Sequence, residues 1–357
     1  MKPARSPREG GQRLLCIDPA AGTFFDAELG GLPSLVRPGD LVVVNDAATL
    51  PGSLYGVSET GAPLELRLLA HGENDRWSAV AFGAGDWRTP TELRPPPPPL
   101  ALGDRLVFSA REPGPWAAPP LAARVEHVSE LSARLLKLRF EAEGAALWRA
   151  LYAAGRPVQY SYLAGPLSLW HVQTSYAARP WAAEAPSAGF ALRWSLLSAL
   201  ARRGVRLAAL THAAGLSSTG HEALDAALPR PERYDIPART ARLVEETRRA
   251  GGRVVAVGTT VVRALEGSAA ANAGRVVAGE AVTALKLGPG TTLRAVDGLL
   301  TGLHEPGTSH FSLLEAFAPA ALLLGSLEHA QAAGYEGHEF GDVSLVLGGL
   351  RATAKAA

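Results

Sequence analysis

The sequence is poor in cysteine, with a single residue, Cys16, in a chain of 357. One thiol cannot form an internal disulfide, and it excludes a cysteine-based metal cluster. The nine histidines show none of the spacings typical of metal ligands. We therefore expect no metal cofactor and a reducing compartment, the cytoplasm by default.

Long apolar runs are also missing. No stretch reaches the roughly 18–20 residues that a membrane-spanning helix needs, and residues 1–15, MKPARSPREGGQRLL, lack the apolar core of a secretory signal. With 47% hydrophobic and 19% charged residues, the composition is that of an ordinary globular protein. We expect no membrane segment and a cytoplasmic location, and composition does not decide between a monomer and a dimer.

Lysine is scarce and the net charge is only +1, so no global basic character indicates nucleic acid. Residues 191–263 are an exception, because they hold twelve arginines and only six acids. The favoured interpretation is a set of solvated helix faces, since ARTARLVEETRRAGG has the pattern of an amphipathic surface helix. The alternative is a surface that contacts RNA.

Several common catalytic motifs are absent. The chain has no GxGxxG after a strand, Walker A lysine, HExxH, GxSxG or CxxC. These absences exclude the common dinucleotide, P-loop, zinc-protease and serine-hydrolase sites. The remaining chemistry is the kind performed by positioned acid–base groups.

The middle of the chain has the sequence pattern of an antiparallel β unit. Between residues 53 and 140, short segments alternate apolar and polar residues and are separated by Gly, Pro and Asp. The five prolines at 95–99 fit neither a helix nor a central strand and predict a polyproline connection.

Helical and strand patterns alternate in the rest of the chain. DLVVV at 40–44 predicts a buried strand, and after residue 141 strands such as RVVAVG alternate with helices such as TTVVRALEGSAAA. One helix is expected over DIPARTARLVEETRRAGG, and another is broken near Pro319. This pattern predicts an α/β fold with a parallel or mixed sheet. We expect an α/β domain formed by residues 1–52 and 141–357, with residues 53–140 inserted as a β-rich domain.

Polar groups gather at the ends of the expected elements. Asn45 and Asp46 follow the first buried strand, at the end where open sheets present ligand-binding groups. Gly258, Thr259 and Thr260 stand where another strand meets a helix. The helix that follows carries Arg263 and Glu266 on nearby faces.

A third cluster runs from Asp297 through Thr301 and His304 to Thr308 and Ser309, where a further helix is expected to begin. Exposed N–H groups at the two helix starts favour a carboxylate or another anion. A threonine there is also an ordinary helix cap, worth on the order of 1 kcal/mol.

Taken together, these segments resemble one family, the S-adenosylmethionine:tRNA ribosyltransferase-isomerases of queuosine biosynthesis. The resemblance spans about Gly39 to Leu347 and rests on GDLVVVND, VQTSYA, APSAG, PERYDI, GTTVVRALE, VDGLLTGLHEPGTS and FGDVSLVL, in this order. It implies two domains, an α/β domain and an inserted antiparallel β-barrel, in agreement with the pattern of the sequence.

The resemblance also implies a reaction. The ribosyl part of S-adenosylmethionine is transferred and isomerised onto a 7-aminomethyl-7-deazaguanine base in tRNA, with loss of adenine and methionine. The sulfonium acidifies the neighbouring ribose proton, so the reaction needs a base, groups that hold the methionine and a dry pocket. S-adenosylmethionine is then a cosubstrate, and no metal is required.

This chain departs from the family pattern at several positions. Ala47-Ala48 replaces Thr-Arg, Gly307 replaces a lysine, and Glu336 and Glu339 stand where the family has basic or neutral residues. Lost positive charge weakens phosphate contacts. Two alternatives therefore stay open: a relative that uses S-adenosylmethionine on a small molecule without tRNA, and an inactive nucleoside-binding module.

Roles for single residues follow from the resemblance. His304 or Glu232 is expected to be the base, Asp297 to orient ribose hydroxyls or the amine, and Asp46 is the next candidate. The other expected binding residues are Asn45, His212, Gly258, Thr259, Thr260, Arg263, Glu266, Thr301, Thr308 and Ser309.

Several of these polar residues also have a structural interpretation. Arg263 either binds the methionine carboxylate or pairs with Glu232 or Glu266. Thr259 and Thr260 are expected both to cap their helix and to face the cosubstrate. Asp342 is expected to be structural, and a histidine such as His212 usually finds a backbone partner. If tRNA binds, the arginines of 191–263 are expected to contact it.

Overall fold

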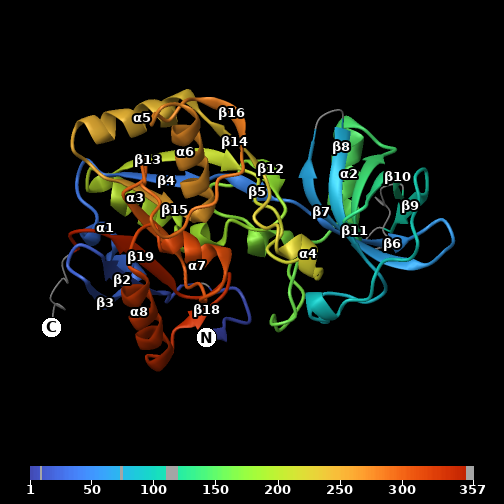
Figure 1. The fold of residues 1–357 in the computed structure, drawn as a ribbon, viewed down its shortest axis with the longest axis horizontal. Coiled ribbons are helices and arrows are strands. Elements are labelled where there is room, and N and C mark those ends of the chain that lie inside the picture. Colours follow the sequence, from blue (N-terminus) through green and yellow to red (C-terminus); the bar gives the residue numbers. More distant parts are fainter. Residues whose placement is uncertain (9, 73–74, 110–119, 351–357) are drawn as a thin grey trace.

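The computed structural model describes residues 1–8, 10–72, 75–109 and 120–350. A large sheet covered by helices forms one part of the molecule, and a closed β-barrel stands beside it (Figure 1). This mixed α/β architecture with an antiparallel barrel confirms the predicted fold class.

The large sheet has nine strands in the order β16, β14, β13, β4, β15, β17, β19, β2 and β3. Strands β13, β4, β15 and β17 run parallel to one another, and β19 lies antiparallel to β17. The bounds are β2 Arg13–Asp18, β3 Thr23–Glu28, β4 Leu41–Asn45, β13 Arg206–His212, β14 Glu232–Ile236, β15 Val254–Val257, β16 Gly279–Thr283, β17 Gly298–Gly302 and β19 Val343–Leu347. Both ends of the chain therefore contribute to one sheet.

Strand β4 shows why the sheet is buried on both faces. All five of its residues are buried, as expected for a continuous apolar run in a parallel sheet. Leu41 and Val43 join one core cluster, and Val42 and Val44 join the other. Alternate side chains therefore serve opposite faces of the sheet.

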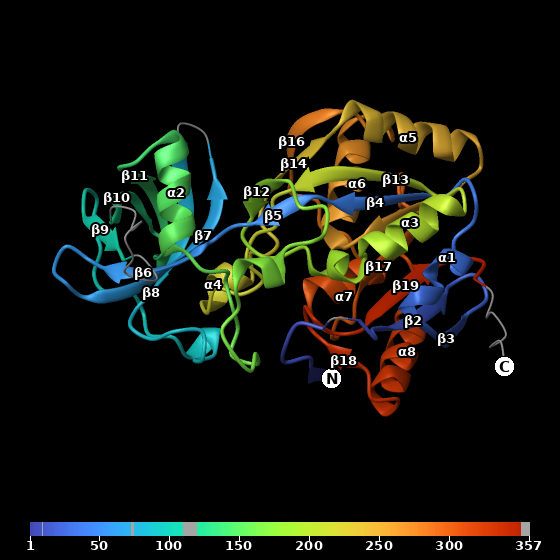
Figure 2. The ribbon, with the colours of Figure 1, turned by 180° about the vertical axis from the view of Figure 1, so that it is seen from behind.

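Helices cover these two faces (Figure 2). Side chains from α5, α6, α7 and α8 fill the first core cluster, and α1 and α3 fill the second. The bounds are α1 Leu32–Leu35, α3 Trp194–Arg202, α5 Ala238–Arg249, α6 Thr259–Ala271, α7 Ser309–Leu314 and α8 Ala320–Ala332. The expected break falls between α7 and α8, where Pro319 is the N-cap of α8.

One helix begins later than the sequence pattern indicated. The expected helix over DIPARTARLVEETRRAGG is α5, but Asp235 and Ile236 belong to strand β14. Pro237 is the N-cap of the helix. The residue before a proline is driven into extended backbone, so the strand reaches the proline and the helix starts after it.

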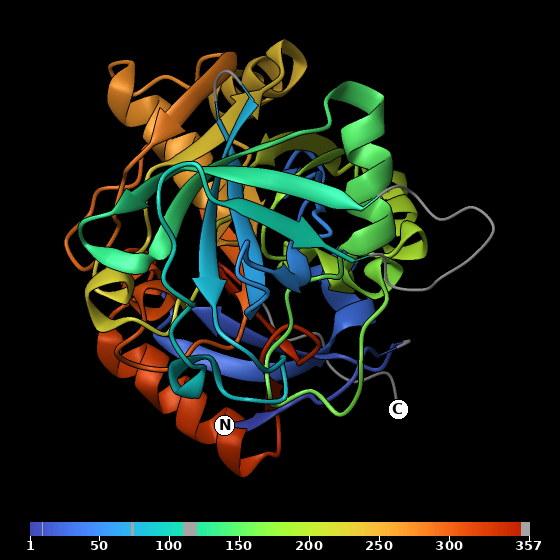
Figure 3. The same ribbon diagram turned by 90° about the vertical axis from the view of Figure 1, so that its right-hand side faces the viewer.

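The barrel is closed in the order β10, β11, β8, β7, β6 and β9, and every pair of strands is antiparallel (Figure 3). Its strands are β6 Ser53–Val57, β7 Pro63–His71, β8 Arg76–Phe82, β9 Arg105–Phe108, β10 Leu121–Ser129 and β11 Ser132–Phe140. Helix α2, Gly144–Ala154, packs on this barrel through Leu147 and Leu151. Its packing thus places it with the barrel, although the sequence analysis assigned residues from 141 onward to the α/β domain.

Short pairings connect the remaining segments. Strand β5, Ala47–Thr49, pairs in parallel with β12, Arg179–Ala182. Strand β1, Lys2–Pro3, pairs with β18, Glu336–Gly337, and helix α4 spans Glu222–Asp225. The prolines at 95–99 lie in neither a helix nor a strand.

A charged cluster is buried beside the barrel core. Glu65 accepts hydrogen bonds from Ser53 Oγ at 2.7 Å and from Arg67 Nε at 2.9 Å, and it also pairs with Arg94. The side chains of all three charged residues are at most 1% exposed. Burial would raise the pKa of Glu65, but the two guanidinium groups hold that pKa below its usual value.

Replacing Glu65 with glutamine tests this cluster. The E65Q change leaves two buried guanidinium groups without a counter-charge, and we expect it to lower the free energy of unfolding by about 3–5 kcal/mol. The matched control is E126Q, because Glu126 forms ion pairs with Arg76 and Arg139 on the barrel surface. Chemical denaturation should show a change within about 1 kcal/mol for E126Q. Equal effects of the two substitutions would contradict the prediction.

Candidate active site

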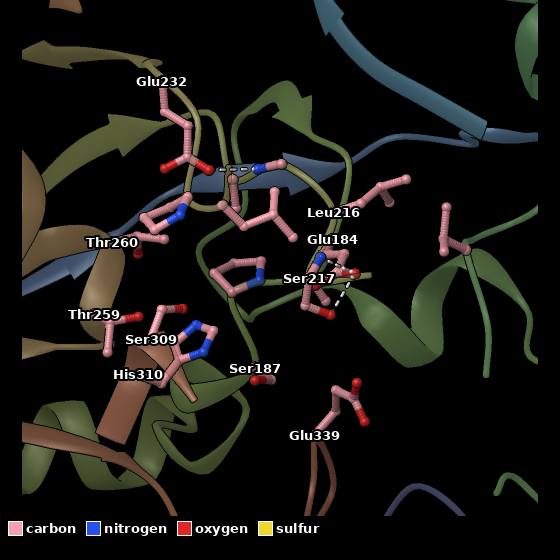
Figure 4. A pocket seen from close by; sticks show the side chains of 18 of the residues that line it. Glu184, Ser187, Leu216, Ser217, Glu232, Thr259, Thr260, Ser309, His310 and Glu339 are labelled. Carbon is pink, nitrogen blue, oxygen red and sulfur yellow. Dashed lines mark hydrogen bonds between the residues drawn. The ribbon is translucent and has the colours of Figure 1, made fainter. Parts of the chain in front are cut away.

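A cleft of about 1320 Å³ lies between the carboxyl ends of the parallel strands and the barrel (Figure 4). Gly258, Thr301 and His304 line it from the sheet, whereas Ser78 and Lys137 line it from the barrel. Carboxyl ends of parallel strands meet at one edge, which is the usual ligand edge of an open sheet. Segments far apart in the sequence therefore share one cavity.

Helix α6 begins at this cleft. Its N-cap is Gly258, whose φ of 88° suits glycine and strains other residues. Thr259 and Thr260 are the first two residues of the helix, and no side chain caps it. The expectation that these threonines cap the helix is therefore wrong, because the chain turns into the helix at the glycine before them. Both threonines line the cleft, and the N–H groups of a first helical turn favour an anion there.

Asn45 fastens the ends of three elements. Its amide nitrogen donates to His212 O at 3.0 Å and to Thr260 Oγ1 at 3.3 Å. Its Oδ1 accepts from the backbone N–H groups of Ala47 at 3.0 Å and His212 at 2.9 Å. Asn45 is not among the residues that line the cleft. It therefore holds β4, β13 and α6 in register behind the cleft wall.

Arg263 forms a structural ion pair with Glu232, one of the alternatives left open by the sequence. It also donates to Leu285 O at 3.1 Å and to Arg230 O at 3.2 Å. The other carboxylate oxygen of Glu232 accepts from Gly215 N at 2.8 Å. Burial lowers the pKa of Arg263 to about 10, so the guanidinium stays charged at neutral pH. Both oxygens of Glu232 are thus occupied within the protein.

His212 is fully buried, and neither of its ring nitrogens has a hydrogen-bond partner in the described chain. Its Nε2 lies 3.5 Å from Glu232 Oε2. Burial and the charge of Arg263 lower its pKa to about 3, so the ring is neutral. The expectation that a backbone group satisfies the ring is wrong, because Asn45 binds the backbone of His212 and leaves the imidazole alone.

His304 and His310 form a stacked pair on the cleft wall. Their ring centroids are 4.8 Å apart with an interplanar angle of 13°, and His304 Nε2 lies 2.9 Å from Thr301 Oγ1. Burial, with a smaller contribution from His310, lowers the pKa of His304 to about 3. Burial and the charge of Arg263 lower the pKa of His310 as well. Both imidazoles are therefore neutral at physiological pH and keep a lone pair.

Thr308 and Ser309 stand at the start of α7. Thr308 is a true N-cap: its Oγ1 accepts from Phe311 N at 3.1 Å and donates to Glu305 O at 2.8 Å. Ser309 is exposed and its side chain faces the cleft (Figure 4). Of the two, Ser309 is the one whose hydroxyl is available to a ligand.

Five predicted site residues lie away from the cleft lining, namely Asn45, His212 and the three acids Asp297, Glu266 and Asp46. Asp297 accepts from Val254 N at 2.8 Å at the start of β15, the opposite edge of the sheet. Glu266 accepts from the backbone N–H groups of residues 294–296. Asp46 accepts from Thr211 Oγ1 at 2.6 Å, and burial raises its pKa. Their carboxylates satisfy local donors, so the geometry gives them structural roles. Asp342 has the expected structural role, because it accepts from the backbone of Arg13 and Glu336.

Sequence reasoning missed Glu184, which projects into the cleft (Figure 4). One of its oxygens accepts from Ser217 N at 2.8 Å, from Ser217 Oγ at 3.0 Å and from the hydroxyl of Tyr160. Burial raises the pKa of Glu184 despite these donors. No local pattern marks this residue, because its partners come from two loops distant in sequence.

Glu339 is the second acid that sequence reasoning did not place at the site. It precedes β19 and lines the cleft, where Figure 4 shows its carboxyl group directed into the cavity. Burial raises its pKa to about 6, so the group is ionised above that pH. The only signal in the sequence was its departure from the family pattern.

The arginines of 191–263 do not form one basic groove. Seven of the twelve pair with acids, namely Arg206, Arg233, Arg242, Arg248, Arg249, Arg253 and Arg263. Arg230, Arg233 and Arg263 are the three of the twelve that line the cleft. Most of the excess charge is therefore spread over helix surfaces.

Comparison with known proteins identifies the family. The family model described as queuosine biosynthesis protein matches residues 2–346. The S-adenosylmethionine:tRNA ribosyltransferase-isomerase of Gluconacetobacter diazotrophicus is 38% identical over 355 residues, covering 96% of this chain and 91% of that protein. The protein of the same name from Gloeobacter violaceus is 34% identical, with coverages of 95% and 90%. The chain belongs to the queuosine biosynthesis protein family.

The fold has a counterpart among solved structures. The crystal structure of an S-adenosylmethionine tRNA ribosyltransferase from Thermotoga maritima aligns with a TM-score of 0.51 at 23% identity. The alignment covers 97% of this chain and 96% of that one. It supports the shared architecture along the whole length.

The described residues contain neither a membrane-spanning helix nor a metal-binding cluster. Within 1–8, 10–72, 75–109 and 120–350, no helix is long and apolar enough to cross a membrane. The same ranges contain no group of three or more His, Cys, Asp or Glu residues arranged to hold a metal ion.

Replacing Glu232 with glutamine separates a structural role from a catalytic one. The E232Q change leaves Arg263 buried without its partner, and we expect the free energy of unfolding to fall by about 3 kcal/mol. The control is E245Q, because Glu245 pairs with Arg249 on the exposed face of α5, and chemical denaturation should detect less than about 0.5 kcal/mol there. An E232Q protein with unchanged stability but no activity would instead make Glu232 the base.

Proposed function

We propose that the chain is an S-adenosylmethionine:tRNA ribosyltransferase-isomerase. It would transfer the ribosyl part of S-adenosylmethionine to a 7-aminomethyl-7-deazaguanine base in tRNA and isomerise it, releasing adenine and methionine. The observation that carries the proposal is the assembly of Gly258–Thr260, Thr301–His304 and Glu232 around one cleft. The relatives that match nearly the full length of the chain bear the name of this activity.

The start of α6 is the proposed site of the methionine carboxylate. Thr259 and Thr260, the first two residues of this 13-residue helix, line the cleft. A carboxylate is stabilised there by N–H donors and by the positive end of the helix dipole. Arg263 contributes its charge to this region, while its guanidinium stays bonded to Glu232.

His304 is the proposed base. Glu232 is occupied by Arg263 and Gly215, and Asp46 and Asp297 lie outside the cleft lining. His304 lines the cleft, is neutral, and is oriented by Thr301. One ring nitrogen would take the proton from the ribose carbon beside the sulfonium, leaving the electron pair on that carbon. The lowered pKa keeps the imidazole unprotonated at neutral pH, so that its lone pair is available to accept a proton.

The size of the cleft fits two reactants. Pockets for a single small molecule usually measure about 300–1,000 Å³, and this cleft is about 1320 Å³. One wall comes from the sheet and the other from the barrel, with the cavity open between them. A nucleoside cosubstrate and an extruded base can therefore share it, as a modification of a base in RNA requires.

Incubation of the purified protein with S-adenosylmethionine, with and without tRNA that carries the deazaguanine precursor, tests the function. We expect adenine and methionine to be released only in the presence of this tRNA, together with a modified base, as followed by chromatography and mass spectrometry. Release without RNA would replace the proposal with a reaction on a small molecule. Binding without any release would leave a nucleoside-binding module.

Replacing His304 with glutamine tests the proposed base. Loss of a general base lowers turnover by about 10²- to 10⁴-fold, so we expect H304Q to release adenine at least about 100 times more slowly. Binding of S-adenosylmethionine, measured by calorimetry, should change by less than about threefold. The control is H329Q, because His329 pairs with Asp26 and does not line the cleft. Turnover by H304Q within tenfold of the wild type would exclude His304 as the base.

A further inference from the structure

Glu339 has one carboxylate oxygen that is buried without a partner. Its Oε2 is inaccessible to solvent and has no hydrogen-bond partner among the described residues. The other four acids that line the cleft, Glu184, Asp225, Glu232 and Glu305, are each bonded to neighbouring groups. Burying an ionised carboxylate without a counter-charge is unfavourable. Such a group in a cleft therefore indicates that a ligand supplies the missing partner.

The segment that carries Glu339 is held in place from both sides. His338 packs against Tyr162 with the ring centroids 4.3 Å apart, and Phe340 stacks on Phe190 at 5.5 Å. Gly341 closes a tight turn in which its N–H donates to His338 O at 3.0 Å. A Cβ at Gly341 would lie 2.4 Å from the carbonyl oxygen of Gly337. Glu339 is thus preorganised, because its neighbours fix the backbone on each side of it.

The position of Glu339 suits the middle of an S-adenosylmethionine molecule whose carboxylate lies at α6. Glu339 precedes β19, and α6 follows β15; one strand, β17, separates the two. Strands two positions apart are about 10 Å apart. The methionine chain, extending from α6, and the side chain of Glu339, extending from the segment before β19, together span the distance between β15 and β19. The ammonium group, by contrast, is one carbon from the carboxylate and stays near α6.

We propose that Glu339 is a cation subsite that recognises the sulfonium of S-adenosylmethionine. The inference rests on the proposed function, which supplies the cosubstrate, and it assigns to Glu339 a role that the sequence pattern of the family does not contain. The carboxylate of Glu339 faces the positively charged sulfur. The sulfonium thereby supplies the counter-charge that no protein group supplies. Glu339 also makes the cleft select the charged sulfonium over a neutral thioether with the same adenosine and amino acid.

Titration calorimetry at pH 7.5 with two probes tests this subsite. S-adenosylmethionine and S-adenosylhomocysteine share the adenine, ribose, carboxylate and ammonium, but only the first carries the sulfonium charge. We expect E339Q to bind S-adenosylmethionine about 10- to 100-fold more weakly than the wild type, because one charge–charge contact is lost. Binding of S-adenosylhomocysteine should change by less than about twofold, which also shows that the variant is folded.

The matched control is E336Q. Glu336 lies on the same segment and pairs with Arg8, but it does not line the cleft. This control removes the same charge from the same segment, and we expect it to bind both probes as the wild type does.

The outcomes separate the subsite from the function on which it rests. Equal weakening of both probes by E339Q would overturn the sulfonium assignment, because the ammonium or the fold would then be responsible. Unchanged binding of both would overturn any ligand role for Glu339. A wild-type protein that binds neither probe would refute the proposed function itself, and the subsite with it.

Discussion

The amide of Asn45 is the interaction on which the cleft depends. One side chain bonds the ends of β4 and β13 and the start of α6, using both its donor and its acceptor atoms. Both polar atoms of this buried amide are hydrogen-bonded. The arrangement of the three elements is therefore fixed, because any shift would leave a buried polar group without a partner. The positions of Thr260 and His212 follow from it. The residue thus acts on the site without lining it.

Several buried charges and titratable groups near the cleft and in the barrel are paired or kept neutral within the protein. Glu232 pairs with Arg263 at the cleft, and Glu65 pairs with Arg67 and Arg94 in the barrel. His212 and His304 are kept neutral by burial, with smaller contributions from Arg263 at His212 and from His310 at His304. The buried Oε2 of Glu339, which has no hydrogen-bond partner among the described residues, is an exception. Local inconsistencies of this kind are expected where a protein binds something.

Local patterns in the sequence were enough to predict the elements and the fold class. The all-apolar run of β4, the period of two in the barrel strands and the break at Pro319 each follow from interactions between near neighbours. Strands β2, β3 and β16 were missed; β3 and β16 form the two edges of the sheet and are mostly not buried, so they lack the continuous apolar run that marked β4. The start of α5 was also predicted too early, because Asp235 and Ile236 of β14 fitted the pattern of a first helical turn before Pro237.

The sequence by itself determined the family, the α/β architecture and the segments that meet at the ligand edge, because these are written in local order and spacing. Only the tertiary structure decided which polar groups of those segments are free. The carboxylates of Asp297 and Glu266 accept hydrogen bonds from backbone N–H groups, and the guanidinium of Arg263 is paired with Glu232. Glu184 and Glu339 meet the cleft from segments with no pattern of their own. The availability of a side chain depends on partners distant in sequence, and only folding brings those partners together.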